Sequence, residues 1–157
     1  MLPVEIDFCT PDDLDGVCAV EEQSFNPPWP REVISRDLSG EGNFLYLCAR
    51  AGRRILGYAV LRKTGRAAEL ANLAVLPSYR RRGVASQLLA GAGELAGELG
   101  CRAVTLRVRV SNEGAAALYR LFGFSSLGRD REYYADGEDA FVMAAPLPLR
   151  LPAGEDI

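Results

Sequence analysis

The spacing of hydrophobic positions changes repeatedly along the chain, and each change marks a predicted element of secondary structure. Alternating or continuous apolar runs predict strands, whereas apolar positions three and four residues apart predict helices. The predicted strands are residues 4–8, 43–50, 55–62, 67–75, 103–110, 125–133 and 139–146. The predicted helices begin at Thr10, Pro30, Gly83 and Ser111 or Asn112. The first of them ends at Pro27 and Pro28, because proline cannot continue a helix.

This order of elements predicts an α+β fold with layered helices and strands. A meander of three strands is followed by a strand–helix–strand crossover, which gives a mixed sheet covered on both faces. We expect a mostly antiparallel central sheet of about seven strands, with about four helices on its two faces. No repeat or linker interrupts the pattern, so residues 1–146 are expected to form one domain. Residues 147–157 have no usable period and are expected to be a loose tail.

Composition excludes several classes of function. The 157 residues carry a net charge of −3, so broad binding to a nucleic-acid backbone is not expected. No window is apolar for 18 residues, and the amino-terminal residues do not resemble a secretory signal. We therefore expect a cytoplasmic protein with no membrane partner, either a monomer or a homodimer.

The chain contains no histidine, which removes histidine bases and histidine-ligated metals from consideration. Its four cysteines, Cys9, Cys18, Cys48 and Cys101, are widely spaced and form no CxxC pair. We expect free thiols and no metal site. Proton transfer would then depend on Glu, Asp, Tyr, Cys, Lys or solvent.

The stretch from Asn72 to Ser86, NLAVLPSYRRRGVAS, is the most informative part of the chain. An apolar strand runs into Pro77, then into a basic loop, and then into a helix that begins at Gly83. Unpaired backbone N–H groups and the positive end of the helix dipole favour a phosphate at such a position. The alternative is a solvated basic loop. A Walker loop and a dinucleotide-binding GxGxxG fingerprint are both absent.

Three ordered motifs resemble those of the GCN5-related N-acetyltransferases, the GNAT family. Residues 80–85 match the motif Q/R-x-x-G-x-G/A, and Leu73-Ala74-Val75 looks like the strand end that precedes it. Residues 112–124 look like the motif N-x-x-A-x-x-L-Y-x-x-x-G-F. The resemblance covers about residues 4–146 and implies the GNAT fold and acetyl-CoA as co-substrate.

Within that family the chain resembles the ribosomal-protein alanine N-acetyltransferases. The segments that carry this resemblance are residues 25–29, 108–112, 131–134 and 138–143. It implies that a protein amino terminus, for example that of a ribosomal protein, is the acceptor. Transfer would be direct, within a complex of enzyme, acetyl-CoA and acceptor.

The family resemblance also implies roles for individual residues. Residues 73–75 would bind the acetyl-pantetheine arm through their backbone, and Asn112 would contact the same arm. Tyr119 would act as general acid toward the departing thiolate. The residues expected around the coenzyme A diphosphate are Arg80, Arg81, Arg82, Gly83, Val84, Ala85 and Ser86.

The resemblance also implies that four further aromatic residues lie on the acceptor side. Phe25 and Trp29 belong to a proline-rich lip, which could instead be an ordinary loop anchored by a buried indole. Tyr133 and Tyr134 lie at the end of a predicted strand. Since neighbouring strand residues point to opposite faces, at most one of these two tyrosines is expected to face the acceptor groove.

Arg107 is the clear departure from the subgroup pattern, because the family's proposed general base, a glutamate, occupies this position. A guanidinium cannot accept a proton near neutral pH. Three explanations stay open. Glu69, or else Glu21, serves as base through water; an α-amine needs no strong base; or Arg107 binds a different, acidic acceptor.

The sequence therefore predicts an acetyl-CoA-dependent N-acetyltransferase that acts on a protein N-terminal amine. One alternative is a GNAT enzyme that acts on a small amine or a lysine side chain. A second alternative, motivated by the missing glutamate, is an acyl-CoA-binding module without catalysis.

Overall fold

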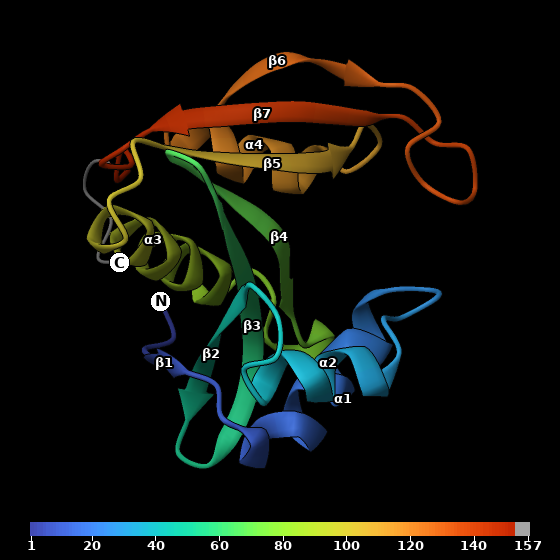
Figure 1. The fold of residues 1–157 in the computed structure, drawn as a ribbon, viewed down its shortest axis with the longest axis vertical. Coiled ribbons are helices and arrows are strands. Elements are labelled where there is room, and N and C mark those ends of the chain that lie inside the picture. Colours follow the sequence, from blue (N-terminus) through green and yellow to red (C-terminus); the bar gives the residue numbers. More distant parts are fainter. Residues whose placement is uncertain (153–157) are drawn as a thin grey trace.

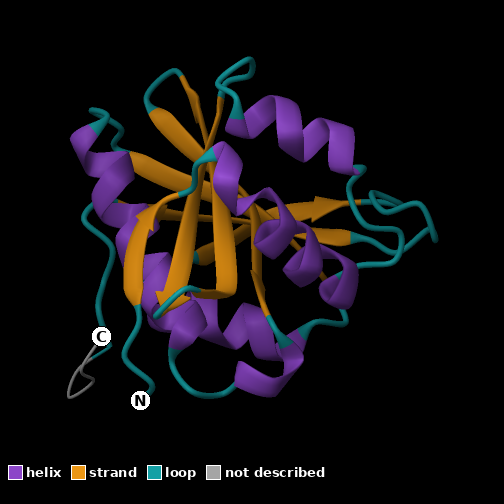
Figure 2. Cartoon of the chain, turned by 90° about the horizontal axis from the view of Figure 1, so that it is seen from below, coloured by secondary structure: helices purple, strands orange, loops and turns teal. Residues whose placement is uncertain are grey.

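A seven-stranded sheet forms the centre of the molecule and carries helices on both faces (Figures 1 and 2). The computed structural model describes residues 1–152. Its strands are β1 (Glu5–Phe8), β2 (Phe44–Ala51), β3 (Arg54–Thr64), β4 (Ala67–Val75), β5 (Ala103–Arg109), β6 (Ser125–Asp130) and β7 (Ala140–Pro146). Its helices are α1 (Leu14–Ser24), α2 (Arg31–Leu38), α3 (Val84–Glu98) and α4 (Glu113–Leu121), with short 3₁₀ turns η1 (Pro11–Asp13) and η2 (Pro77–Tyr79). The predicted fold class is confirmed.

The sheet opens between its two parallel strands. The strand order is β1-β2-β3-β4-β5-β7-β6, and every neighbouring pair is antiparallel except β4 and β5. These two strands pair only where residues 67–70 face residues 103–106. Beyond that point their backbone groups no longer bond to one another, which leaves room for a ligand between the strands.

The central strand β3 is buried on both faces, which explains its continuous apolar sequence. Tyr58 and Val60 face α1 and α2, in a cluster that also contains Val17 and Ile34. The alternate residues of β3 face a second and larger cluster, to which α3 and α4 contribute. The two helical layers therefore lie on opposite sides of the sheet, as Figure 2 shows.

The sixth strand is shorter than predicted. It ends at Asp130, and residues 131–139 form a loop before β7. Arg109 of β5 holds this loop, because its Nη1 donates to the carboxylates of Asp136 at 2.8 Å and Glu138 at 2.9 Å. Glu138 also accepts the backbone N–H of Ser111 at 2.9 Å. The sequence pattern predicted that the sixth strand continues to residue 133. In the structure, ion pairs and a side-chain-to-backbone hydrogen bond hold this part of the chain as a loop instead.

The chain after β7 is packed as far as Arg150 rather than loose. The N–H of Leu147 donates to the carbonyl of Arg102 at 2.8 Å, and the N–H of Arg150 donates to that of Phe122 at 3.1 Å. Leu149 packs against the main hydrophobic cluster. The prediction of a loose tail is therefore wrong for residues 147–150, while residues 153–157 lie outside the described part of the chain.

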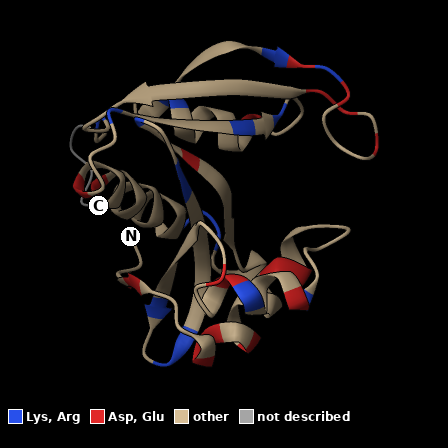
Figure 3. Cartoon of the chain, viewed as in Figure 1, with Lys and Arg blue, Asp and Glu red and all other residues tan. Residues whose placement is uncertain are grey.

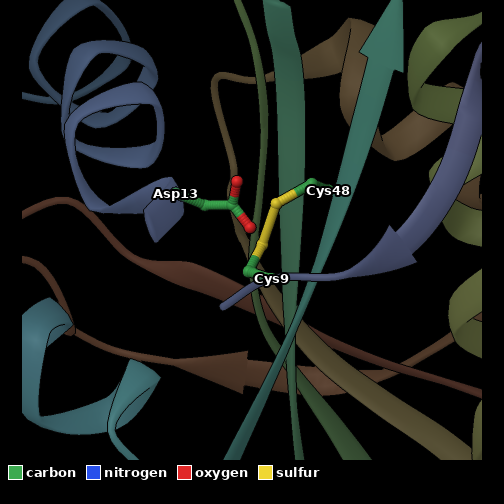
Figure 4. A group of neighbouring side chains, drawn as sticks. All are labelled: Cys9, Asp13 and Cys48. Carbon is green, nitrogen blue, oxygen red and sulfur yellow. A yellow bond between two sulfur atoms is a disulfide. The ribbon is translucent and has the colours of Figure 1, made fainter. Parts of the chain in front are cut away.

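Two of the four cysteines form a disulfide, so the prediction of four free thiols is wrong for Cys9 and Cys48. Cys9 directly follows β1, and the antiparallel pairing of β1 with β2 brings it beside Cys48 (Figure 4). Asp13 lies next to this disulfide, but it forms an ion pair with Arg50 at 2.6 Å, which holds the pKa of Asp13 below its usual value. Cys18 and Cys101 are free and buried.

None of the helices described in residues 1–152 is both long enough and apolar enough to cross a membrane.

Candidate active site

A cavity of about 600 Å³ occupies the opening between β4 and β5, within the size range of small-molecule sites. Residues 69–73 of β4 and residues 107–109 of β5 form its two sides. The other lining residues are Glu21, Phe25, Asn26, Pro27, Trp29, Phe44, Arg62, Asn112, Ala115, Tyr119, Tyr133, Tyr134 and Ala135. Figure 3 shows acidic residues on α1, and residues of both charges on α2 and in the loop between β6 and β7. The lining residues from α1, β3, β4 and β5 include charged side chains, so the cavity has polar groups on several of its walls.

A basic loop joins the end of β4 to α3. Arg81 has φ 61° and Gly83 has φ 82°, so the backbone turns twice through the left-handed region. Such turns bring successive N–H groups toward a common point, which suits an anion. The first N–H groups of the fifteen-residue helix α3, at Val84, Ala85 and Ser86, have no partner within the helix. These features fit the diphosphate site that the sequence predicted for this loop.

The three consecutive arginines of the loop point in different directions. Arg80 turns back to the sheet, where its Nε donates to the carbonyl of Val75 at 2.9 Å and its Nη2 lies 3.4 Å from Ser24 Oγ. The guanidinium of Arg82 lies 6.0 Å from the ring centre of Tyr79. Arg81 and Arg82 are exposed. Arg80 thus fixes the end of β4, whereas its two neighbours are open to an approaching anion.

Tyr119 lines the cavity from α4. Its side chain is 8% exposed, and its ring packs against Phe124 with ring centres 5.6 Å apart. Burial raises the pKa of the Tyr119 phenol, so the hydroxyl stays protonated at neutral pH. No hydrogen-bond partner of this hydroxyl occurs among the described residues, which leaves it available to a ligand. Asn112 begins the same helix, where its Oδ1 accepts the N–H of Ala115 at 3.2 Å.

Glu21 is the buried centre of a hydrogen-bond network. It is 1% exposed and accepts the Trp29 N–H at 2.8 Å, the Asn72 amide at 3.0 Å and the Tyr58 hydroxyl. A buried carboxylate is costly unless donors surround it, and these three supply that compensation. Burial and the neighbouring Glu21 raise the pKa of Tyr58. Glu21 therefore fixes the proline-rich lip to the sheet.

Glu69 lies in a chain of ion pairs that joins residues of four strands, β3, β4, β5 and β6. One of its oxygens accepts from Arg62 at 2.7 Å and the other from Arg107 at 3.2 Å. Arg107 also donates to Asp130 at 2.6 Å. Both predicted functional charges at this point, Glu69 and Arg107, are thus already paired within the protein.

Both tyrosines of the loop line the cavity, so the prediction that at most one of them faces the groove is wrong. The alternation rule does not apply here, because Tyr133 and Tyr134 lie after the end of β6. Their rings meet edge to face with centres 5.0 Å apart. The guanidinium of Arg107 lies 5.0 Å from the Tyr133 ring, and that of Arg109 lies 4.0 Å from the Tyr134 ring. The arginines of β5 therefore support the two rings.

Among the residues that were not identified from the sequence, four make the hydrogen bonds and ring contacts described above: Tyr58, Arg62, Asn72 and Arg109. Polar residues within otherwise apolar strands were the available signal, since Tyr58 and Asn72 interrupt such runs in β3 and β4. The predicted residues Phe25 and Trp29 do line the cavity, as do Leu73 and Asn112. Residues 80–86 lie outside its lining, beyond the end of β4.

Comparison with known proteins gives consistent matches. Residues 14–124 match the family model "Acetyltransferase (GNAT) family". The chain is 40% identical over 148 residues to an uncharacterized protein of Mycobacterium leprae, covering 90% of this chain but only 40% of that protein. It is 36% identical over 148 residues to the N-alpha-acetyltransferase RimI of Mycobacterium tuberculosis, covering 90% of this chain and 91% of that one.

A solved structure has the same architecture over nearly the whole chain. The ribosomal-protein-S18-alanine N-acetyltransferase from Escherichia coli superposes with a TM-score of 0.82 at 30% identity, covering 99% of each chain. The family model spans well over half of the present chain, and its matched range includes the end of β4, the basic loop and α4. The chain therefore belongs to the GNAT family of acetyl-CoA-dependent N-acetyltransferases.

Proposed function

We propose that this enzyme transfers the acetyl group of acetyl-CoA to the N-terminal α-amine of a protein. The observation that carries the proposal is the opening between β4 and β5, which the two loop tyrosines line and whose β4 side continues beyond Val75 into the basic loop. A thioester can enter along β4 from the basic loop, and an extended peptide can enter from the side of the tyrosines. The names of the Mycobacterium tuberculosis and Escherichia coli relatives support this choice of acceptor, and a ribosomal protein is one candidate.

The acetyl-CoA would lie along β4 with its diphosphate at residues 81–86. Gly83 adopts the left-handed φ of 82° that this turn requires, and the N–H groups of the first turn of α3 point out of the helix end. The pantetheine arm would follow Leu73 and Val75, where β4 no longer pairs with β5. Asn112 and Tyr119 border the same opening from α4.

The reaction is a direct transfer between the two substrates. The acceptor nitrogen attacks the thioester carbonyl, so that a C–N bond forms and the C–S bond breaks. Tyr119 donates its proton to the departing sulfur and regains one from solvent; burial raises the pKa of its phenol, so the hydroxyl is protonated at rest. Holding both substrates in the same opening supplies much of the rate, because the reacting atoms no longer need to find one another.

The surplus proton of the amine leaves to water in this proposal, because neither predicted carboxylate is free to accept it. Both oxygens of Glu69 are held by arginines, and Glu21 is enclosed by its three donors. Arg107 is occupied by Glu69 and Asp130, which argues against its use as a receptor for an acidic acceptor. Of the three open explanations, the geometry favours an amine that needs no strong base.

An N-terminal amine is such an acceptor. About a tenth of α-amines are neutral at pH 7, compared with roughly one lysine side chain in 2,500. A site without a dedicated base should therefore prefer the α-amine. The rings of Tyr133 and Tyr134 and the lip at Trp29 would bind the residues that follow it.

The test uses two versions of one peptide with N-terminal alanine and a single internal lysine. The free peptide should be acetylated at its α-amine, and the version with a blocked N-terminus should react at least about a hundredfold more slowly at pH 7. Release of coenzyme A measures the rate, and fragmentation mass spectrometry locates the acetyl group. Equal rates, or transfer to lysine alone, would assign the enzyme to side-chain or small-amine acceptors. Tight acetyl-CoA binding without transfer to any amine would reject the proposal.

A further inference from the structure

The amino-terminal residues lie against the start of α3, more than 80 positions away in sequence. The N–H of Leu2 donates to the carbonyl of Arg82 at 2.8 Å. The side chain of Met1 occupies the space beside Gly83, since a Cβ added to Gly83 would lie 2.7 Å from Met1 Cγ. Figure 1 shows the amino terminus near α3, opposite the helices α1 and α2. This segment therefore borders the basic loop.

Gln87 connects the segment to the loop. Its Nε2 donates to the carbonyl of Leu2 at 2.7 Å and to that of Gly83 at 3.0 Å, while its Oε1 accepts the N–H of Val4 at 3.2 Å. Gln87 is 9% exposed, and it is followed in α3 by the fully buried Leu88. A buried amide is destabilising unless its polar groups are paired. Here the partners are the backbone groups of Leu2 and Val4 on one side and of Gly83 on the other, so Gln87 joins the amino-terminal residues to the basic loop.

These bonds determine where the loop's N–H groups point. In a trans peptide the C=O and the N–H point in opposite directions. The carbonyl of Arg82 points toward Leu2, so the N–H of Gly83 points away from the amino-terminal segment. The carbonyl of Gly83 points along α3 toward Gln87, so the N–H of Val84 points out of the helix end.

We propose that Gln87 and the amino-terminal segment Met1–Val4 position the diphosphate-binding loop for acyl-CoA. The inference rests on the proposed function, since it assumes that the diphosphate lies at this loop. Gln87 does not need to touch the ligand: it is a positioning residue that acts through the carbonyls of Leu2 and Gly83. The left-handed conformation of Arg81 is unfavourable for a residue with a side chain, and such a conformation persists only where its surroundings hold it.

Replacing Gln87 by methionine keeps the length of the side chain and removes all three of its hydrogen bonds. We expect the KM for acetyl-CoA to rise about tenfold, because the loop N–H groups lose alignment with a charged acceptor. The kcat and the KM for the peptide should not change. With S-acetyl-pantetheine, which lacks the diphosphate, kcat/KM should be equal for the variant and the wild type.

The matched control is Ile6→Ala. Ile6 lies in β1, the strand that directly follows residues 1–4 and also packs against α3. A Cβ on Gly91 of α3 would lie 3.0 Å from Ile6 Cγ2, but Ile6 makes no bond to Gln87 or to the loop. This variant should lower the melting temperature while leaving the KM for acetyl-CoA unchanged.

A second variant deletes Leu2 and Pro3, and it should reproduce the Gln87→Met effect. The combination of that deletion with Gln87→Met should be no worse than either alone, because both changes interrupt one connection.

The two proposals fail in different ways. If the wild type uses acetyl-pantetheine as well as acetyl-CoA, the diphosphate is not held and the proposed placement of the substrate is wrong. If the wild type prefers acetyl-CoA, but Gln87→Met and the deletion both leave its KM unchanged, only the positioning role is overturned. That role is also overturned if Ile6→Ala raises the KM as much as Gln87→Met, or if Gln87→Met impairs both thioesters equally.

Discussion

Replacement of Gly83 by valine is expected to weaken acetyl-CoA binding by about a hundredfold. The residue has φ 82°, where a side chain costs about 1–2 kcal/mol. Its Cβ would also lie 2.7 Å from Met1 Cγ, so the loop or the Met1 side chain must move. Backbone strain and this displacement both act on the loop whose N–H groups would face the diphosphate, and together they correspond to about two factors of ten in affinity. Isothermal titration calorimetry with acetyl-CoA measures the effect.

Gly65→Val is the matched control for this substitution. Gly65 has φ 63° in the turn between β3 and β4, and a Cβ there would meet nothing within 4 Å. It should therefore suffer similar backbone strain and a similar loss of thermal stability while its affinity for acetyl-CoA remains that of the wild type. Unchanged affinity in Gly83→Val would show that the diphosphate does not approach this loop.

Replacement of Tyr119 by phenylalanine is expected to lower kcat about a hundredfold, the lower end of the range for loss of a general acid. The KM values should change little, because the ring keeps its packing against Phe124. Among the described residues the hydroxyl has no protein partner, so its removal should not lower the free energy of unfolding. Steady-state kinetics and a urea unfolding curve together separate the two effects.

Tyr46→Phe provides the comparison for Tyr119→Phe. The Tyr46 hydroxyl donates to Asp37 at 2.7 Å, and Tyr46 is not among the residues that line the cavity. Loss of that bond should cost about 1 kcal/mol of stability and leave kcat unchanged. If Tyr119→Phe keeps full activity, the sulfur takes its proton from solvent, and the catalytic role of this tyrosine is wrong.

The elements that border the site could be predicted because they are local. Strand β4 begins and ends where its apolar run does, at Ala67 and Val75. Helix α3 begins after Gly83, and Asn112 caps α4 through its own side chain. Turn glycines, capping residues and hydrophobic periodicity act within a few residues, so the sequence displays them directly.

The partnerships within the site could not be predicted in this way, because they join residues that are distant in sequence. Glu21 meets Tyr58 and Asn72 across separations of 37 and 51 residues, and Gln87 reaches Leu2 across 85. The disulfide at Cys48 depends on the register of β1 against β2. Hydrophobic pattern predicts that a residue is buried, but the fold alone decides which polar group it meets.

A crystal structure of the enzyme with coenzyme A bound tests the proposed substrate placement most directly. We predict that the diphosphate oxygens accept hydrogen bonds from the backbone N–H groups of Gly83 and Val84. We also predict that the sulfur lies between β4 and β5, within hydrogen-bond reach of the Tyr119 hydroxyl. A diphosphate bound away from residues 81–86, or a sulfur outside the cavity that Tyr119 lines, would contradict this placement.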